Sequence, residues 1–548
     1  MSSRCASVAA ALLVVLLPVS VAAWPDNVSI RDVPLKPWTG FARNWDWTYD
    51  ALQHLVLSGI AGKVVLNTKP MSRREMALIL ADVIRRVQAN QVSEFDHRKD
   101  LEPLLLELLD EFSPELLALG VSGYGIAGEP PRLLEVKPLQ FLQARGAYTS
   151  NAPTNLENTN GERLKQGLSG RLASASWLEL GGVLAGYANP EFQVGPDQVN
   201  GQLIEGYGKV RGGPLELVAG REALWWGPGF HGSMLLSNNA LGLDMVRLQT
   251  ANQVTLPWVF RYLGPMKLAW FFGQFEEERD FPRTKLMGFR VDLAPVSWLE
   301  LGFARTFMFG GDGRPQPPWY QWPALLVVSS DNNASNFSGN NLFQIDASVR
   351  LANVGKYLPF VRDVELYFDV GVDDTCCETA FIPLKPGGLV GLYLPNLFQS
   401  PDTTFRVEYS RTTSFNFAHS TYTDGYVRKG QVMSHFEGTS GEDLFFRLTQ
   451  RLKPQLMVGI EVDLARRGRT QAGFAFSTKE LNRHFGVDLS YQHSKNLTLQ
   501  LGARLEWVRN RDFVAGDNDI NQVFTFALTY AFDAAFGAGG RATRSPDR

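Results

Sequence analysis

The stretch LTLQLGARLEW, at residues 497–507, alternates apolar and polar side chains along its whole length. Leucine, alanine and tryptophan fall on one face, and threonine, glutamine, arginine and glutamate fall on the other. A period of two is typical of a β-strand with one face in apolar surroundings. Strands of soluble sandwiches usually run about 5–6 residues, whereas a strand that crosses a bilayer at a tilt needs about 9–11. The stretch therefore predicts a membrane-spanning strand.

Similar alternation recurs between residues 136 and 532, and the polar face often carries charges. Further examples lie at residues 343–351, 364–372, 456–464 and 524–532. Lipid offers a free sheet edge no hydrogen-bond partner, so such a sheet must close on itself. The segments predict a mainly β fold, a large antiparallel transmembrane β-barrel of roughly 18 strands over residues 136–532.

The start of the chain predicts a secretory signal peptide. Arg4 supplies a positive charge, residues 9–17 form a short apolar core, and residues 21–23 form a small-residue cleavage site. The signal would span residues 1–23, and its core is too short to be a transmembrane helix. A net charge of −3 argues against a nucleic-acid partner.

Residues 24–120 predict a bundle of three helices on the periplasmic side of the membrane. The first helix follows a potential cap at Asp46, and the second opens with a capping box formed by Ser72 and Glu75. The third is leucine-rich and covers residues 101–112. Each helix has one apolar face, as a small bundle requires.

Residues 49–84 within this bundle resemble an S-layer homology module, and such modules hold cell-wall polymers. The resemblance implies peptidoglycan as a partner of the bundle, while a bundle that plugs or braces the barrel is the alternative. A linker at residues 121–135 leads into the barrel, and a tail at residues 533–548 follows it.

The sequence contains no H-E-x-x-H, G-x-S-x-G or P-loop motif, and none of its seven histidines pairs with another at metal-ligand spacing. We therefore predict no catalytic residue, no metal site and no cofactor. Cys376 and Cys377 are the cysteines that remain after signal cleavage. They could form a strained vicinal disulfide or stay as two thiols.

A run of unusual composition, GREALWWGPGFHGSMLLSNNA, occupies residues 220–240. Sugar rings stack on tryptophan, and their hydroxyls bond to amides, carboxylates and guanidinium groups. The run predicts polysaccharide contacts at Arg221, Glu222, Trp225, Trp226, His231, Ser237, Asn238 and Asn239. The alternatives are membrane-interface packing for the tryptophans, pairing of Arg221 and Glu222 with each other or with lumen charges, and a structural role for His231.

Three long connections, at residues 310–341, 373–388 and 412–441, are predicted to be surface loops, because barrels place their long loops outside the cell. The first repeats the combination of aromatic and amide side chains. Its predicted sugar contacts are Trp319, Tyr320 and Trp322.

The run at 220–240 resembles the central motif of the capsule assembly protein Wzi family, and DGYVRKGQVMSHFEGTSGEDLFFRL at residues 424–448 resembles a second segment of that family. The resemblance extends over the signal, the helical bundle and the barrel. It implies an outer-membrane lectin, not an enzyme, that binds capsular or extracellular polysaccharide and assists its attachment. We expect a monomer surrounded by outer-membrane lipid.

The inward faces of the predicted strands carry charges of both signs, for example Arg350, Asp346, Glu461, Asp463, Arg504 and Glu506. Opposite charges can pair and fill the interior, which predicts a barrel without a wide pore. A general porin or solute channel, a surface enzyme that uses His231 or His435, and a cell-wall tether are the alternative functions.

Overall fold

The computed structural model describes residues 26–35, 47–89, 98–151, 154–195, 198–322, 339–373, 386–468 and 478–538. The predicted signal peptide, Asp46, both vicinal cysteines and most of the C-terminal tail lie outside the described residues. Within the described ranges, no helix combines the length and the apolar character needed to cross a membrane.

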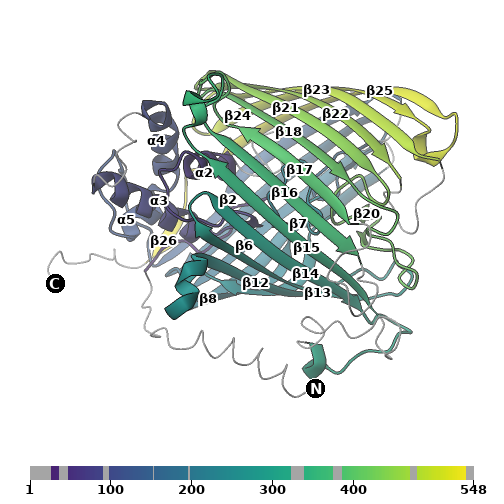
Figure 1. The fold of residues 1–548 in the computed structure, drawn as a ribbon, viewed down its shortest axis with the longest axis horizontal. Coiled ribbons are helices and arrows are strands. Elements are labelled where there is room, and N and C mark those ends of the chain that lie inside the picture. Colours follow the sequence, from purple (N-terminus) through teal and green to yellow (C-terminus); the bar gives the residue numbers. More distant parts are fainter. Residues whose placement is uncertain are drawn as a thin grey trace.

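The barrel is a closed antiparallel sheet in which each long strand pairs with the next along the chain (Figure 1). Its eighteen long strands are β2 (Leu134–Thr149), β5 (Gly167–Leu180), β6 (Leu184–Gly195), β7 (Gln198–Gly212), β8 (Leu215–Glu222), β10 (Leu243–Thr250), β12 (Pro265–Gln274), β13 (Lys285–Val296), β14 (Leu299–Phe309), β15 (Asn340–Leu351), β16 (Val364–Asp373), β17 (Gly387–Leu394), β18 (Thr403–Arg411), β21 (Glu442–Lys453), β22 (Leu456–Arg467), β23 (Glu480–Gln492), β24 (Leu497–Arg509) and β25 (Asn518–Ala531).

Two short strands, β11 (Val254–Thr255) and β26 (Phe536–Ala538), extend the sheet locally. The barrel closes where β25 pairs with β2, with Leu528 opposite Ala144. The prediction of a closed antiparallel barrel with roughly 18 strands is therefore confirmed.

Alternation along the strands separates an apolar exterior from a polar interior. On β24, Leu501 and Trp507 are exposed on the outer surface, whereas Gln500 and Glu506 are buried inside. Leu501 stands opposite Phe526 of β25, which is also exposed. A continuous apolar exterior of this kind suits a surrounding of acyl chains.

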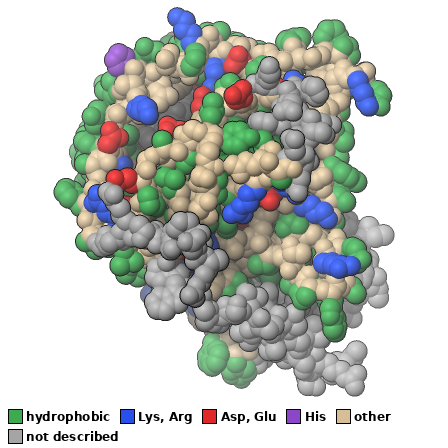
Figure 2. All heavy atoms as spheres, turned by 90° about the vertical axis from the view of Figure 1, so that its left-hand side faces the viewer, with side chains coloured by type: hydrophobic (Ala, Val, Ile, Leu, Met, Phe, Trp, Pro, Cys, Tyr) green, Lys and Arg blue, Asp and Glu red, His purple; other side chains and the backbone are tan. Residues whose placement is uncertain are grey.

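The helices α2 (Trp47–Leu57), α3 (Arg73–Gln88), α4 (Glu102–Glu111) and α5 (Ser113–Ala118) gather at the end of the barrel where the turns are short (Figure 1). Arg451, beside the turn between β21 and β22, contacts Glu107 of α4 at 2.6 Å. Figure 2 looks onto this end, where hydrophobic side chains and charged side chains of both signs are interspersed. We call it the helical end, and the opposite end the loop end.

The predicted helices form with two differences. Ser72 caps α3 by accepting a hydrogen bond from the Glu75 amide at 3.1 Å, but the Glu75 side chain turns away from the cap to the barrel wall. The third predicted helix, at residues 101–112, is present as α4, and a further short helix that was not predicted, α5, follows it with Pro114 in its first turn.

Short elements complete the connections between these helices and strands. They are β1 (Thr68–Lys69), β3 (Thr154–Asn155), β4 (Arg163–Leu164), β9 (Trp225–Trp226), β19 (Val427–Arg428), β20 (Gln431–Val432) and the 3₁₀ helices η2 (Lys99–Leu101), η3 (Trp258–Leu263), η4 (Trp319–Gln321), η5 (Val354–Lys356) and η6 (Arg511–Phe513).

Candidate functional site

The N-terminal segment at residues 26–35 is buried against the inner wall of the barrel. Asp32 pairs with Lys209 of β7 at 2.5 Å and with Arg247 of β10 at 2.9 Å. The Asp32 amide also donates to the Tyr207 hydroxyl at 2.9 Å. Each of these contacts joins a segment that precedes the barrel to a strand that lines it.

Residues 60–72 make a second set of contacts with the wall. The amides of Leu66 and Asn67 both donate to one carboxylate oxygen of Glu300 at 2.8 Å. Arg350 donates to the Val64 carbonyl at 2.9 Å and pairs with Glu300. These contacts fill the interior at the helical end.

The charges predicted to line the lumen do pair with one another or with this segment. Asp346 contacts Arg290 at 2.7 Å, and Glu461 contacts Arg504 at 3.2 Å. Asp463 lies 3.2 Å from the His231 ring. The predicted pairing of inward charges is therefore present.

The run at residues 220–240 leaves β8 and folds into the barrel. Trp225 and Trp226 are 0% and 1% exposed, and they pair as strand β9 with β1, which lies within residues 60–72. The Trp225 indole donates to the Gly229 carbonyl at 3.1 Å, and Trp226 packs edge-on against Phe271 at 5.5 Å. Neither ring faces lipid, so packing at the membrane interface is wrong for this pair, and neither offers an open face to a sugar.

The turn after the tryptophans depends on glycine. Gly227 has a φ of +121°, and a Cβ there would lie 2.8 Å from the Gln344 amide nitrogen and 2.9 Å from Asp369. The glycine at this position lets the run turn close to strands β15 and β16.

Arg221 and Glu222 point to opposite faces of β8 and do not pair with each other. Arg221 contacts the exposed Asp244 at 2.7 Å, whereas buried Glu222 contacts Arg247 at 2.6 Å inside the barrel. Successive side chains of a strand alternate in direction, which explains the separation.

Ser237, Asn238 and Asn239 are also buried, and other parts of the chain use their polar groups. The Ser237 amide donates to the Met433 carbonyl at 2.8 Å, and the Asn239 side chain donates to the Val432 carbonyl at the same distance. The Asn238 side chain donates to the Leu35 carbonyl at 3.3 Å. These amides therefore stabilise contacts between segments.

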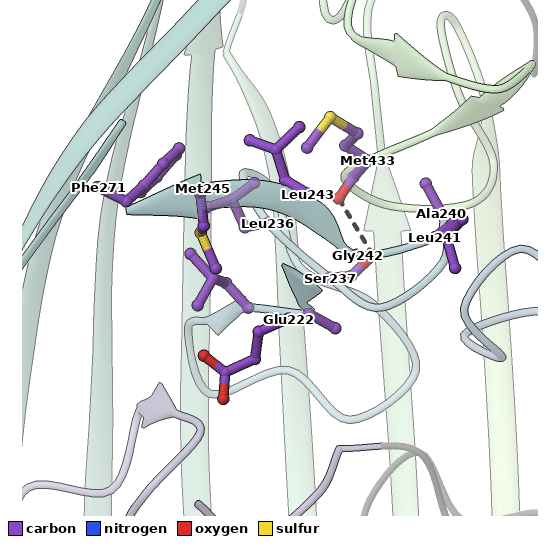
Figure 3. A pocket seen from close by; sticks show the side chains of 12 residues that line it. Glu222, Leu236, Ser237, Ala240, Leu241, Gly242, Leu243, Met245, Phe271 and Met433 are labelled. Atoms are coloured by element: carbon purple, nitrogen blue, oxygen red, sulfur yellow. Dashed lines mark hydrogen bonds between the residues drawn. The ribbon is translucent and has the colours of Figure 1, made fainter. Parts of the chain in front are cut away.

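The Ser237–Met433 contact joins the two segments that resemble the Wzi motifs (Figure 3). The cavity between them, lined by Glu222, Phe271 and Met433 among others, measures about 20 Å³. Such a space holds about one water molecule and no sugar ring.

Residues 412–441 are largely buried in the same region, so their prediction as a surface loop is wrong. Several of their polar groups bond to the wall or to the first motif: the Ser434 carbonyl accepts from the Ser237 hydroxyl at 2.7 Å, and Glu437 accepts from the Ser410 hydroxyl at 2.9 Å.

His231 is held in the same region by two strands. Its amide donates to Glu408 of β18 at 2.7 Å, and its ring stacks on Phe445 of β21 with 3.8 Å between the ring centroids. The ring is 6% exposed, so its predicted contact with an external polysaccharide is not available in this arrangement.

The second predicted group of sugar contacts lies elsewhere. Trp319 and Tyr320 are 76% and 64% exposed in the connection that follows β14. Trp322 stacks on Phe272 at 4.7 Å, on the outer side of the barrel. Trp322 therefore packs as tryptophans do at a membrane interface, while the first two rings are open to solvent.

A cavity of about 570 Å³ opens at the loop end, where sequence reasoning predicted no site. Its volume is within the range of about 300–1,000 Å³ that is usual for ligand pockets. Basic side chains outnumber acidic ones in its lining. The basic residues are Arg163, Lys165, Arg171, Lys429, Arg467 and Arg511, and the acidic ones are Glu480, Glu506 and Asp512.

Hydrogen-bonding groups that suit a saccharide also line this cavity, from Gln193, Asn200, Gln202 and Asn482. The side-chain amide oxygen of Asn482, Oδ1, is buried and has no hydrogen-bond partner among the described residues. Arg163 donates to the Lys429 carbonyl at 3.1 Å, and its side chain remains exposed at the cavity.

The lining residues come from distant parts of the chain, from Gly161 to Phe513. No local motif marks them, which is why spacing arguments missed the cavity. The available signal was the occurrence of basic and amide residues at the loop ends of several predicted strands.

The model of the capsule assembly protein Wzi family matches residues 143–523. The chain belongs to this family. A protein of 55.8 kDa from the cps region of Klebsiella pneumoniae is 31% identical over 147 residues, which is 26% of this chain and 29% of that protein.

Among solved structures, Wzi of Escherichia coli superposes with a TM-score of 0.67 at 19% identity, over 90% of this chain and 100% of that one. That protein is described as an outer-membrane, carbohydrate-binding β-barrel involved in group 1 capsule assembly. OprD of Pseudomonas aeruginosa has a TM-score of 0.42 at 9% identity, over 72% of this chain and 97% of its own. The chain is thus an outer-membrane β-barrel of the Wzi family.

Proposed function

We propose that this protein binds capsular or extracellular polysaccharide at its loop end and assists the attachment of that polymer to the cell surface, without catalysing a reaction. The observation that carries the proposal is the basic, amide-lined cavity of about 570 Å³ at the loop end. Membership of a capsule assembly family supports a glycan ligand, as does the carbohydrate binding described for the similar Escherichia coli barrel.

The excess of basic side chains in the cavity favours an acidic polysaccharide. Guanidinium groups match carboxylates in geometry, and hydrogen bonds to charged groups contribute about 1.5–3 kcal/mol each. Arg171 and Arg467 are held in place by buried acids, Glu191 and Glu157, each at 2.7 Å. Their positions are therefore fixed before a polymer arrives.

The interior supports this proposal over that of a general porin. Asp32 bonds to β7 and β10, and the Leu66 amide bonds to β14. The run at 220–240 is buried and pairs with β1 through Trp225 and Trp226. We place the helices in the periplasm. The side chains of the S-layer-like segment that contact the wall, such as Gln53 and Glu75, serve to dock it.

Binding of the purified protein to acidic and neutral polysaccharides, by calorimetry in detergent, tests the proposal. The variant with Lys165→Glu and Lys429→Glu should bind an acidic polymer at least tenfold more weakly, because two charge-assisted contacts become repulsive. Lys453→Glu, with the same type of charge change at the helical end, should bind normally. Equal binding by all three proteins, or none by the wild type to any polymer on a glycan array, would overturn the proposal.

A further inference from the structure

The two Wzi-like segments meet at a buried group of metal-binding side chains. His231 comes from the first segment, Asp443 from the second, and Asp463 from the neighbouring strand β22. His231 Nε2 lies 3.2 Å from Asp463 Oδ2 and 3.7 Å from Asp443 Oδ2. One donor atom from each residue lies within 4.8 Å of the others, and all three residues are buried.

Within the described part of the chain, each of the two aspartates has a carboxylate oxygen without a hydrogen-bond partner. The Oδ1 atoms of Asp443 and Asp463 are buried and have no hydrogen-bond partner among the described residues. Nearby Arg467 pairs with Glu157 at 2.7 Å, and Arg504 pairs with the same carboxylate at 2.9 Å. A buried carboxylate oxygen without a partner destabilises the folded state. Arg467 and Arg504 pair with Glu157, so a bound cation would give the two aspartates a positive partner.

The imidazole is held ready to coordinate. Its ring stacks on Phe445 and meets Phe436 edge-on at 4.8 Å, so it cannot rotate freely. Gly232, the next residue, leaves room for the His435 ring, because a Cβ there would lie 2.0 Å from it. On the far side, His484 Nδ1 lies 3.5 Å from Asp463 Oδ2, where it can orient the carboxylate as an outer-shell partner.

We propose that His231, Asp443 and Asp463 bind one divalent transition-metal ion, with Zn²⁺ the best fit. One imidazole nitrogen and two carboxylate oxygens are usual zinc ligands, whereas calcium and magnesium prefer oxygen ligands alone. The ion would neutralise the two carboxylates and join the first motif to β21 and β22. The three side chains leave one position of a tetrahedral site for a further ligand, and the role of the ion would be structural, since the group is buried.

The test measures metal content of the full-length, untagged protein in detergent. After treatment with a chelator and dialysis, the protein is titrated with Zn²⁺ alone, and bound zinc is measured by plasma mass spectrometry. We expect one zinc per chain and a higher thermal unfolding temperature with zinc. Asp463→Asn and His231→Gln should each weaken binding by roughly 100-fold or more, since even outer-shell changes cost 10–100-fold. His493→Gln, in the exposed turn between β23 and β24, should bind zinc as the wild type does.

A second measurement does not depend on the variants folding. Cobalt added to the wild-type protein should give visible absorption bands of a low-coordinate site that zinc then abolishes. A wild-type protein that binds no stoichiometric zinc, shows no cobalt bands and unfolds at the same temperature with and without zinc would overturn the proposal.

Discussion

Glu75 of helix α3 and Lys267 of strand β12 form a buried ion pair, with Lys267 Nζ 2.6 Å from Glu75 Oε2. The lysine also donates to the Thr68 carbonyl at 3.3 Å. Burial raises the pKa of Glu75, and Lys267 opposes that shift. The pair joins the helical end to the wall at a point where neither partner has access to water.

Removing one member of this pair should loosen the helical end. Lys267→Met leaves Glu75 buried without its cation, which should lower the free energy of unfolding by about 3–5 kcal/mol. Urea unfolding in detergent, followed by tryptophan fluorescence, measures the loss. The double variant Glu75→Leu with Lys267→Met should recover most of it, because apolar pairs of similar volume often replace buried ion pairs at little cost. Equal losses in both proteins would contradict this account.

Acid should destabilise the protein through His54 of α2. Burial lowers the pKa of this histidine from 6.5 to about 4. The folded state therefore disfavours the charged form of the ring. The unfolded chain binds this proton below pH 6.5 and the folded chain only near pH 4, so the free energy of unfolding decreases as the pH falls from 6.5 to 4.

The variant His54→Gln should show a shallower dependence of unfolding free energy on pH in this window, by about 1.4 kcal/mol per pH unit. Asp32 does not contribute to the pH dependence of stability in this window. Although burial alone would raise its pKa, Lys209 and Arg247 hold it at about 2, so Asp32 titrates below the window. Identical slopes for wild type and variant above pH 4 would refute the prediction.

The buried position of Trp226 predicts a stability defect instead of a simple loss of sugar binding. Trp226→Ala should cost about 3–5 kcal/mol, as expected for a large side chain removed from a packed core. Trp319→Ala, at a ring that is 76% exposed, should leave thermal unfolding unchanged. If Trp226→Ala unfolds like the wild type but no longer binds polysaccharide, direct stacking on this ring is the better interpretation.

Binding at the loop-end cavity should depend strongly on salt. The exposed lysines of its lining, Lys165 and Lys429, attract a polyanion through water, and such attraction is screened within about 8 Å at physiological ionic strength. The affinity for an acidic polymer should fall as sodium chloride rises from low to physiological concentration. A neutral polymer of similar size should show no such fall, and salt-independent binding of the acidic polymer would argue against a cavity contact.

Local periodicity was sufficient to predict the wall of the barrel. The alternation around Leu501 and Trp507 depends only on which side of a strand each residue occupies, and this is a property of neighbouring positions. The capping of α3 by Ser72 is likewise local, and it is present. The destination of the Glu75 side chain was not predictable, because its partner Lys267 is far away in the chain.

The interior segments show why the site was harder to predict. A run rich in glycine, serine and asparagine has the composition of a surface loop, yet Ser237 and Asn238 are buried because Met433 and Leu35 satisfy them. Composition cannot distinguish amides that bond to sugar or water from amides that bond to distant carbonyls. The cluster around His231 could not be predicted for the same reason, because its partners Asp443 and Asp463 lie far away in the chain, on β21 and β22.

The wall of the barrel is completed by pairing its first strand, β2, with its last, β25. The cylinder therefore cannot be sealed until the final part of the chain has been delivered to the membrane. Residues 26–35, which contact β7 and β10 from within, precede every strand of the wall. This part of the barrel interior is therefore synthesised before the strands that surround it, whereas the interior runs at 220–240 and 412–441 are synthesised between strands of the wall.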